Sequence, residues 1–229
     1  MIRLDNVSKS YKLRHGGRRQ VLQNVTAEFP TGVNVGILGL NGAGKSTLIR
    51  LLSGAELPDK GTITSTGHIS FPLGFASIFH PDLTGRDNLK FLARVYGANI
   101  DDMLAYVDWF SQLGRMLDSP TSTYSSGMLA KVAFAASLAI DFDHYLIDEI
   151  TEVGDGIFRE KAAHEFRRKM SHADMVVVSH NPGTIREYCD IAGIIHGGAL
   201  EMYESVDETL RRFDIICREN AVGDLNYVS

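Results

Sequence analysis

The sequence predicts an α/β fold built around a parallel sheet. Residues 1–37 have the pattern of strands, and the apolar run 33–39 leads directly into a glycine-rich turn and a helix. From Thr84 to about residue 139 the apolar side chains recur at helical spacing instead. Strands and helices then alternate toward the end of the chain, which is typical of parallel strands joined by crossover helices.

The N-terminal strands are expected to form an antiparallel β lobe. Ile2 and Leu4 alternate with charged residues, so one face of the first strand is apolar. A basic turn containing glycine, residues 13–20, then leads into a second strand that reads VLQNVTAEF. Pro58–Gly61 forms a further turn before the next short strand.

The helical insertion is expected to span residues about 84–139. Thr84 and Asp87 have the spacing of a capping box at its start, and a third helix runs from about Ser126 to Ala139. A short amphipathic helix over about 205–219 ends the pattern. We therefore expect a single domain over residues 1–229 with two lobes.

Composition excludes several classes of protein. The 229 residues are 44% hydrophobic and 22% charged, as in ordinary globular domains, and the formal net charge of −5 argues against a nucleic-acid partner. Cys189 and Cys217 lack the spacing of a zinc site or a disulfide framework. No run reaches the ~18 apolar residues of a membrane span, and MIRLDNVSKSYK is not a signal peptide. We expect a cytosolic chain that meets a membrane only through a partner.

A phosphate-binding loop joins the strand at residues 33–39 to the following helix. The pattern G-x-x-x-x-G-K-[ST] is complete, and it lies between a strand and a helix, as such loops do. Glycines let the backbone wrap around phosphates, Lys45 reaches the β- and γ-phosphates, and Ser46 binds Mg²⁺. We predict ATP and Mg²⁺ as cofactors, with the nucleotide held by Gly39, Leu40, Asn41, Gly42, Ala43, Gly44, Lys45, Ser46 and Thr47.

Polar residues follow two later strands. Asp148 and Glu149 come after the apolar run Tyr145–Ile147, and His180 follows an apolar run that ends at Ser179. Strand ends line the ligand crevice of a parallel sheet, so these side chains are expected to converge on one phosphate. Asp148 would hold Mg²⁺, Glu149 would orient and deprotonate the attacking water, and His180 would contact the γ-phosphate.

The segment Tyr124–Met128, at the head of a helix before Asp148, resembles the LSGGQ signature of ABC-transporter ATPases. The resemblance covers nearly the whole chain and implies a P-loop ABC-type nucleotide-binding domain with a RecA-like core. It also implies a head-to-tail dimer in which Ser125 and Gly127 of one subunit close on the ATP of the other. By the same resemblance, Tyr11 stacks on adenine and Asp155 is the D-loop aspartate.

The chain departs from the common pattern of this family in two places. Its signature keeps only the serine and the second glycine. The glutamine expected a few residues before His80 is absent, because that stretch reads FPLGFASIF. Two aromatic residues of this stretch, Phe75 and Phe79, are expected to form a groove for a permease helix.

HPDLTGRDNLKF and the run from Asp148 to Asp155 resemble the ABC ATPases that export bacterial surface polysaccharides, with capsular polysaccharide favoured. This resemblance implies an integral-membrane permease dimer as partner and a peripheral place on the cytoplasmic face of the inner membrane. Export of O-antigen or teichoic acid is an alternative. So are a soluble ABC ATPase of DNA repair or translation and a regulatory subunit with a degenerate site.

Overall fold

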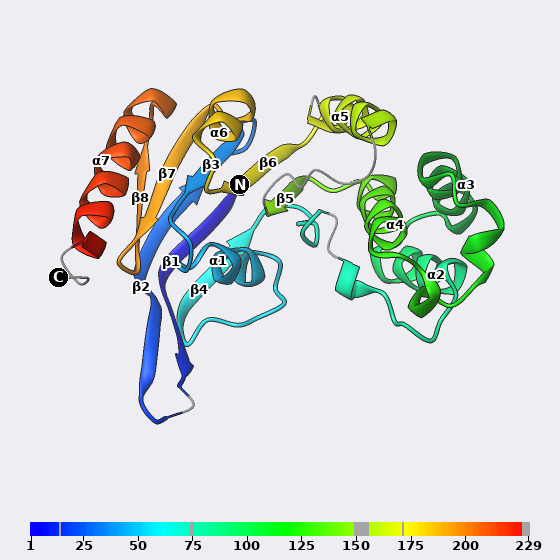
Figure 1. The fold of residues 1–229 in the computed structure, drawn as a ribbon, viewed down its shortest axis with the longest axis horizontal. Helices are drawn as coiled ribbons and strands as arrows, with labels where there is room; N and C mark the ends of the chain where they lie inside the picture. The colour runs from blue at the N-terminus through cyan, green and yellow to red at the C-terminus, as the bar shows by residue number, and fades with distance from the viewer. Residues whose placement is uncertain (14, 74–75, 149–155, 171, 226–229) are drawn as a thin grey trace. The chain divides into compact units, whose positions relative to one another are not determined.

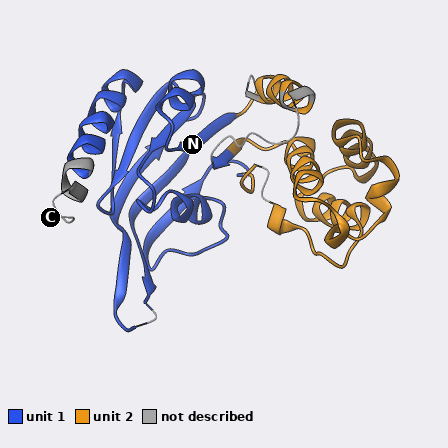
Figure 2. Ribbon diagram, viewed as in Figure 1, with its two compact units in different colours: residues 1–69, 146–150, 174–229 blue, residues 70–145, 151–173 orange. Residues whose placement is uncertain are grey.

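The computed structural model describes two compact units, which Figure 2 distinguishes by colour. Unit 1 contains residues 1–69, 146–150 and 174–229, and unit 2 contains residues 70–145 and 151–173. The residues whose structure is described are 1–13, 15–73, 76–148, 156–170 and 172–225. Unit 2 includes the expected helical lobe of residues 84–139 and extends beyond it on both sides.

The N-terminal strands form a three-stranded sheet in unit 1 (Figure 1). The central strand β1 (Ile2–Lys12) pairs antiparallel with β2 (Arg18–Phe29) on one side and with β4 (Lys60–Ser65) on the other. This is the antiparallel β lobe that the alternation of residues 2–5 predicts. Its inward side chains, such as Leu4, are fully buried.

The second sheet has the strand order β5-β6-β3-β7-β8. β3 lies at its centre and pairs parallel with both β6 and β7, as crossover connections require. β8 runs antiparallel to β7, because the two strands form a hairpin. The strands are β3 (Val35–Leu38), β5 (His144–Asp148), β6 (Asp174–Ser179), β7 (Ile191–His196) and β8 (Ala199–Tyr203).

Unit 1 also contains the three helices α1, α6 and α7 among its described residues. α1 (Lys45–Leu52) follows the glycine-rich turn and buries Leu48 in a core shared with β1, β3 and β6. α6 (Pro182–Tyr188) has proline at its first position, where the missing N–H costs no hydrogen bond. α7 (Val206–Leu225) begins at the expected place and continues beyond residue 219.

Unit 2 is helical and has an aromatic interior. Its helices are α2 (Gly85–Tyr96), α3 (Ile100–Ser111), α4 (Ser126–Ala139) and α5 (Gly156–Met170), with short 3₁₀ turns at Ala76–Ile78, Gly114–Asp118 and Thr121–Thr123. The predicted cap of α2 is present, because Thr84 Oγ1 accepts a hydrogen bond of 3.0 Å from the Asp87 backbone N–H. Phe110 of α3 lies with ring centroids 6.0 Å from Phe134 and 5.1 Å from Phe158.

The expected aromatic groove is not formed by Phe79. Its side chain is only 7% exposed, so it belongs to the interior of unit 2 and cannot line a surface for a partner. Phe75 lies outside the described residues. Among the described helices, none combines the length and the apolar character that crossing a membrane requires.

The start of β4 depends on Gly61, the second residue of this strand. Its φ is +82°, and a Cβ built there would lie 2.4 Å from the backbone oxygens of both Asp5 and Asn6. Gly54 has a similar φ of +73° but has open space around it.

We predict that Gly61→Ala lowers the free energy of unfolding by more than ~2 kcal/mol, because backbone strain and a backbone clash act together. Gly54→Ala is the control and should cost only ~1 kcal/mol. Urea unfolding of the two variants checks the difference, and equal losses would contradict the role of the close contact.

Candidate active site

The loop between β3 and α1 has a backbone that only glycine adopts readily. Gly42 has φ +78°, and Gly44, the N-cap of α1, has φ +117°. Two neighbouring strands also approach this loop closely. A Cβ at Gly39 would lie 2.5 Å from Ile195 Cγ2, and one at Gly44 would lie 2.9 Å from Val21 Cγ1. The glycines of the motif therefore serve both the turn and its packing.

Lys45 is buried at the start of α1, with 7% of the residue exposed. Its Nζ donates hydrogen bonds to the backbone oxygens of Gly39 at 2.8 Å and Leu40 at 3.1 Å. An ammonium group has three N–H donors, so one remains for an acceptor that a ligand brings. The cation is thereby held within the turn that is predicted to surround the phosphates.

The residues present fit a magnesium nucleotide. Ser46 is exposed on the first turn of α1, and Asp148 is half-buried at the end of β5. The described residues contain no group of three or more acidic, histidine or cysteine side chains that would hold a metal alone. Mg²⁺ in nucleotide sites needs no such group, because one or two side chains, phosphates and water complete its shell.

The ends of three adjacent strands lie together in the sheet. Leu38 of β3 pairs with Ser179 of β6, so Gly39 and His180 are the next residues on paired strands. β5, which ends at Asp148, is the neighbour of β6 in the strand order. The strand order thus places the phosphate loop, Asp148 and His180 on neighbouring strands, and their convergence on one phosphate stays a prediction. Glu149 and Asp155 lie outside the described residues.

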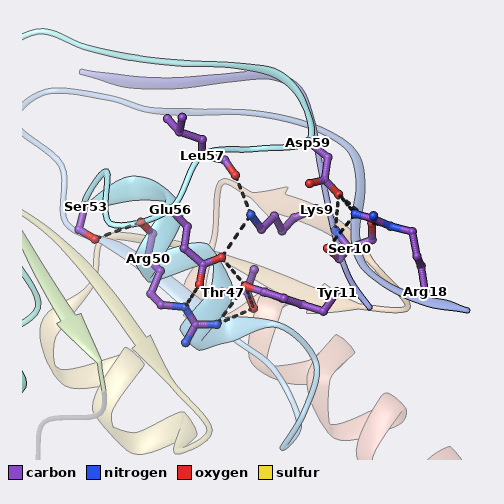
Figure 3. Close-up of polar contacts among 10 residues, drawn as sticks. All are labelled: Lys9, Ser10, Tyr11, Arg18, Thr47, Arg50, Ser53, Glu56, Leu57 and Asp59. Carbon is purple, nitrogen blue, oxygen red and sulfur yellow. Dashed lines mark hydrogen bonds and ion pairs between the residues drawn. The ribbon is translucent and has the colours of Figure 1, made fainter. Parts of the chain in front are cut away.

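Tyr11 stands near the end of β1, on the side of the phosphate loop. Its hydroxyl donates a hydrogen bond of 2.6 Å to Glu56 Oε2 (Figure 3). Arg19 lies directly opposite Tyr11 in the strand register, and its Nη2 donates 3.1 Å to the Gly42 backbone oxygen. Sequence reasoning missed Arg19 and Glu56 as neighbours of this site, because only the register of the β1–β2 hairpin and the path of the loop after α1 bring them there.

Ser125 and Gly127 lie at the start of α4 in unit 2. Ser125 is the N-cap, and its Oγ accepts a hydrogen bond of 3.2 Å from the Met128 backbone N–H. Both residues are exposed, and a Cβ at Gly127 would meet nothing within 4 Å. The N-terminus of a 14-residue helix is thus open to an anion or to another molecule.

Residues 22–152 match the ABC transporter family. The ATP-binding protein BexA of Haemophilus influenzae is 44% identical over 214 residues, which cover 93% of this chain and 98% of the relative. The chain belongs to the ABC transporter family. It is an ATPase of that family, as the signature segment, the phosphate loop and the strand-end residues predict.

Other relatives agree with this family assignment. The capsule polysaccharide export ATP-binding protein CtrD of Neisseria meningitidis is also 44% identical over 214 residues, covering 93% of this chain and 99% of the relative. A dimeric ATP-binding cassette solved in a post-hydrolysis state with ADP and phosphate superposes with a TM-score of 0.72 at 21% identity, over 89% of this chain and 98% of that one. The predicted ABC-type fold is confirmed.

We predict that Lys45→Ala lowers ATP turnover at least ~100-fold, because a charge aimed at the phosphates is lost. Lys60→Ala, which removes an exposed lysine at the start of β4, should leave turnover unchanged. Phosphate release by the purified variants measures the effect. A Lys45→Ala protein that hydrolyses ATP as fast as the Lys60→Ala control would contradict the assignment of the loop.

Proposed function

We propose that this ATPase drives the export of a capsular polysaccharide across the bacterial inner membrane. The observation that carries the proposal is the match to CtrD, named as a capsule polysaccharide export protein, at 44% identity over 99% of that protein. The polysialic acid transport protein KpsT of Escherichia coli, at 42% identity over 97% of its length, supports the same substrate class.

O-antigen export is the second candidate and has weaker support. The O-antigen export protein RfbB of Myxococcus xanthus is 39% identical over 185 residues, which are only 41% of that protein. A relative from Klebsiella pneumoniae with the same name is 34% identical over 76% of its length. The capsular proteins match over a larger share of both chains, so we favour their substrate class.

The proposed chemistry assigns each polar group to a part of Mg-ATP. Lys45 and the backbone amides of residues 39–47 bind the phosphates, and Ser46 and Asp148 hold Mg²⁺, which neutralises charge on the phosphates. Glu149 orients the attacking water and accepts its proton, and His180 contacts the γ-phosphate. The adenine base stacks on the ring of Tyr11. Most of the rate comes from positioning and charge stabilisation, since the protein forms no covalent bond to the phosphate.

The proposed assembly is a head-to-tail homodimer bound to an integral-membrane permease dimer. Ser125 and Gly127 of one copy, at the exposed start of α4, would face the γ-phosphate held by the other copy, with Asp155 near the same interface. The chain would then reach the membrane only through the permease, at its cytoplasmic face. The proposal includes no nucleic-acid partner.

We predict that Glu149→Gln binds Mg-ATP and dimerises but hydrolyses it at least ~100-fold more slowly, because the general base is removed while the phosphate loop remains. Glu160→Gln, an exposed position on α5, is the matched control. Phosphate release and light scattering with Mg-ATP measure both properties. Near-normal turnover of Glu149→Gln would overturn its role as base.

The substrate class is tested by capture of the Glu149→Gln variant from its native membranes in Mg-ATP, followed by mass spectrometry. We expect a multi-span permease together with an acidic glycan or glycolipid of the capsule. A permease carrying O-antigen or another cargo would overturn the capsular assignment and keep transport. Recovery of only soluble or nucleic-acid partners would overturn transport, while the ATPase activity would stand.

A further inference from the structure

A cluster of polar side chains joins β1 to α1 beside the phosphate loop (Figure 3). Glu56, in the segment that follows α1, lies at its centre. Glu56 Oε2 accepts a hydrogen bond from the Tyr11 hydroxyl at 2.6 Å and lies 3.3 Å from Lys9 Nζ. Its other oxygen, Oε1, accepts one from Arg50 Nε at 2.7 Å. One carboxylate thus contacts two residues of β1 and one of α1.

Arg50 completes the connection from the helix side. Its Nη2 donates hydrogen bonds to the Tyr11 hydroxyl oxygen at 3.1 Å and to Thr47 Oγ1 at 3.3 Å. A phenol has one proton to donate and lone pairs to accept with. The Tyr11 proton is used by Glu56 and a lone pair by Arg50, so this acid–base pair fixes the far end of the Tyr11 ring.

The same guanidinium acts on a residue of the phosphate-binding motif. Thr47 is buried on the first turn of α1, directly after Lys45 and Ser46. Because Arg50 donates to Thr47 Oγ1, the threonine hydroxyl can direct its own proton to an acceptor brought by a ligand. Arg50, which belongs to the same helix α1, therefore links the Tyr11 hydroxyl to Thr47.

Charge keeps this cluster intact at neutral pH. Burial opposes ionisation of Glu56, but the hydrogen bonds from Tyr11 and Lys9 and the charge of Arg50 outweigh it, so the pKa of the carboxyl lies below its ordinary value. The pKa of Arg50 is raised, first by its hydrogen bond to Tyr11. Both groups stay charged, and hydrogen bonds between ionised partners are the stronger kind.

From these contacts we infer that Glu56 and Arg50 are positioning residues that hold the Tyr11 ring as a platform for the nucleotide base, at a fixed place relative to Thr47. The inference rests on the proposed stacking of the base on Tyr11. A tyrosine side chain without these hydrogen bonds would lose conformational freedom when a base binds. That entropic cost would lower the affinity for the nucleotide. Anchoring the hydroxyl in advance removes this cost.

A second polar cluster provides the control, because it fastens the same loop to the same strand without touching Tyr11. Asp59 Oδ2 accepts hydrogen bonds from the Ser10 backbone N–H at 2.8 Å and from Arg18 Nη2 at 3.1 Å. Arg18→Ala therefore weakens the attachment of the loop and leaves the contacts of Glu56 with Tyr11 and Arg50 in place.

The test compares ADP, which has a base, with pyrophosphate, which has none. Calorimetry in Mg²⁺ gives both dissociation constants for the wild type, for Glu56→Ala, Tyr11→Phe, Tyr11→Ala and Arg18→Ala, and for the Glu56→Ala/Tyr11→Phe double variant. We expect Glu56→Ala and Tyr11→Phe each to raise the dissociation constant of ADP roughly fivefold or more. The dissociation constant of pyrophosphate should rise by less than about twofold. The Glu56→Ala/Tyr11→Phe double variant should bind ADP no more than about twofold more weakly than either single variant, because both substitutions break the same hydrogen bond. Arg18→Ala should change neither ligand.

Three results would overturn the inference, and they separate it from the proposed function. If Tyr11→Ala lowers the affinity for ADP relative to that for pyrophosphate while Glu56→Ala does not, the base stacks on Tyr11 but Glu56 does not position the ring. If Tyr11→Ala leaves the ratio unchanged, the stacking proposal itself is wrong and positioning falls with it. If Glu56→Ala lowers the affinity for ADP and for pyrophosphate equally, Glu56 supports α1 and the phosphate-binding loop and does not position Tyr11. Should Glu56→Ala unfold, Glu56→Gln, which keeps one acceptor oxygen, should give an intermediate loss of ADP affinity.

Discussion

The close packing of the phosphate-binding loop against two strands is the constraint on which the nucleotide site depends. Ile195 of β7 and Val21 of β2 approach Gly39 and Gly44 so closely that neither position has room for a Cβ. The loop can then turn back on itself, and Lys45 donates to its backbone oxygens. Because backbone groups rather than mobile side chains shape this turn, its donors are ordered before a ligand arrives.

The hairpin of β1 and β2 in the β lobe also contacts the phosphate-binding loop and α1 through polar side chains. Its hairpin places Tyr11 opposite Arg19, and Arg19 reaches the backbone oxygen of Gly42. The loop after α1 returns Glu56 to Tyr11, so the strand, the helix and the loop share one set of charged hydrogen bonds. The β lobe is therefore tied to the phosphate-binding loop and to α1 near the turn of its hairpin.

Unit 2 also has an exposed helix N-terminus, at the start of α4. The N-terminus of α4 is capped by Ser125, and the aromatic side chains of α3, α4 and α5 pack behind it around Phe110. Lys161 lies 3.7 Å from the centroid of the Trp109 ring and donates to the Trp109 backbone oxygen at 2.7 Å, which ties α5 to α3. The helix that begins at these exposed residues is thus packed against α3 and α5.

The sequence alone determined the order of strands and helices, the phosphate-binding loop and the cap of α2, because each of these depends on residues close together in the chain. The burial of Phe79 and the neighbours of Tyr11 were decided only by the tertiary structure. Glu56 lies 45 positions from Tyr11 along the chain, and no local periodicity specifies that pairing. Strand register and the path of a loop arise from packing across the whole lobe, and this is the physical reason why the phosphate-binding loop could be predicted from the sequence and the neighbours of Tyr11 could not.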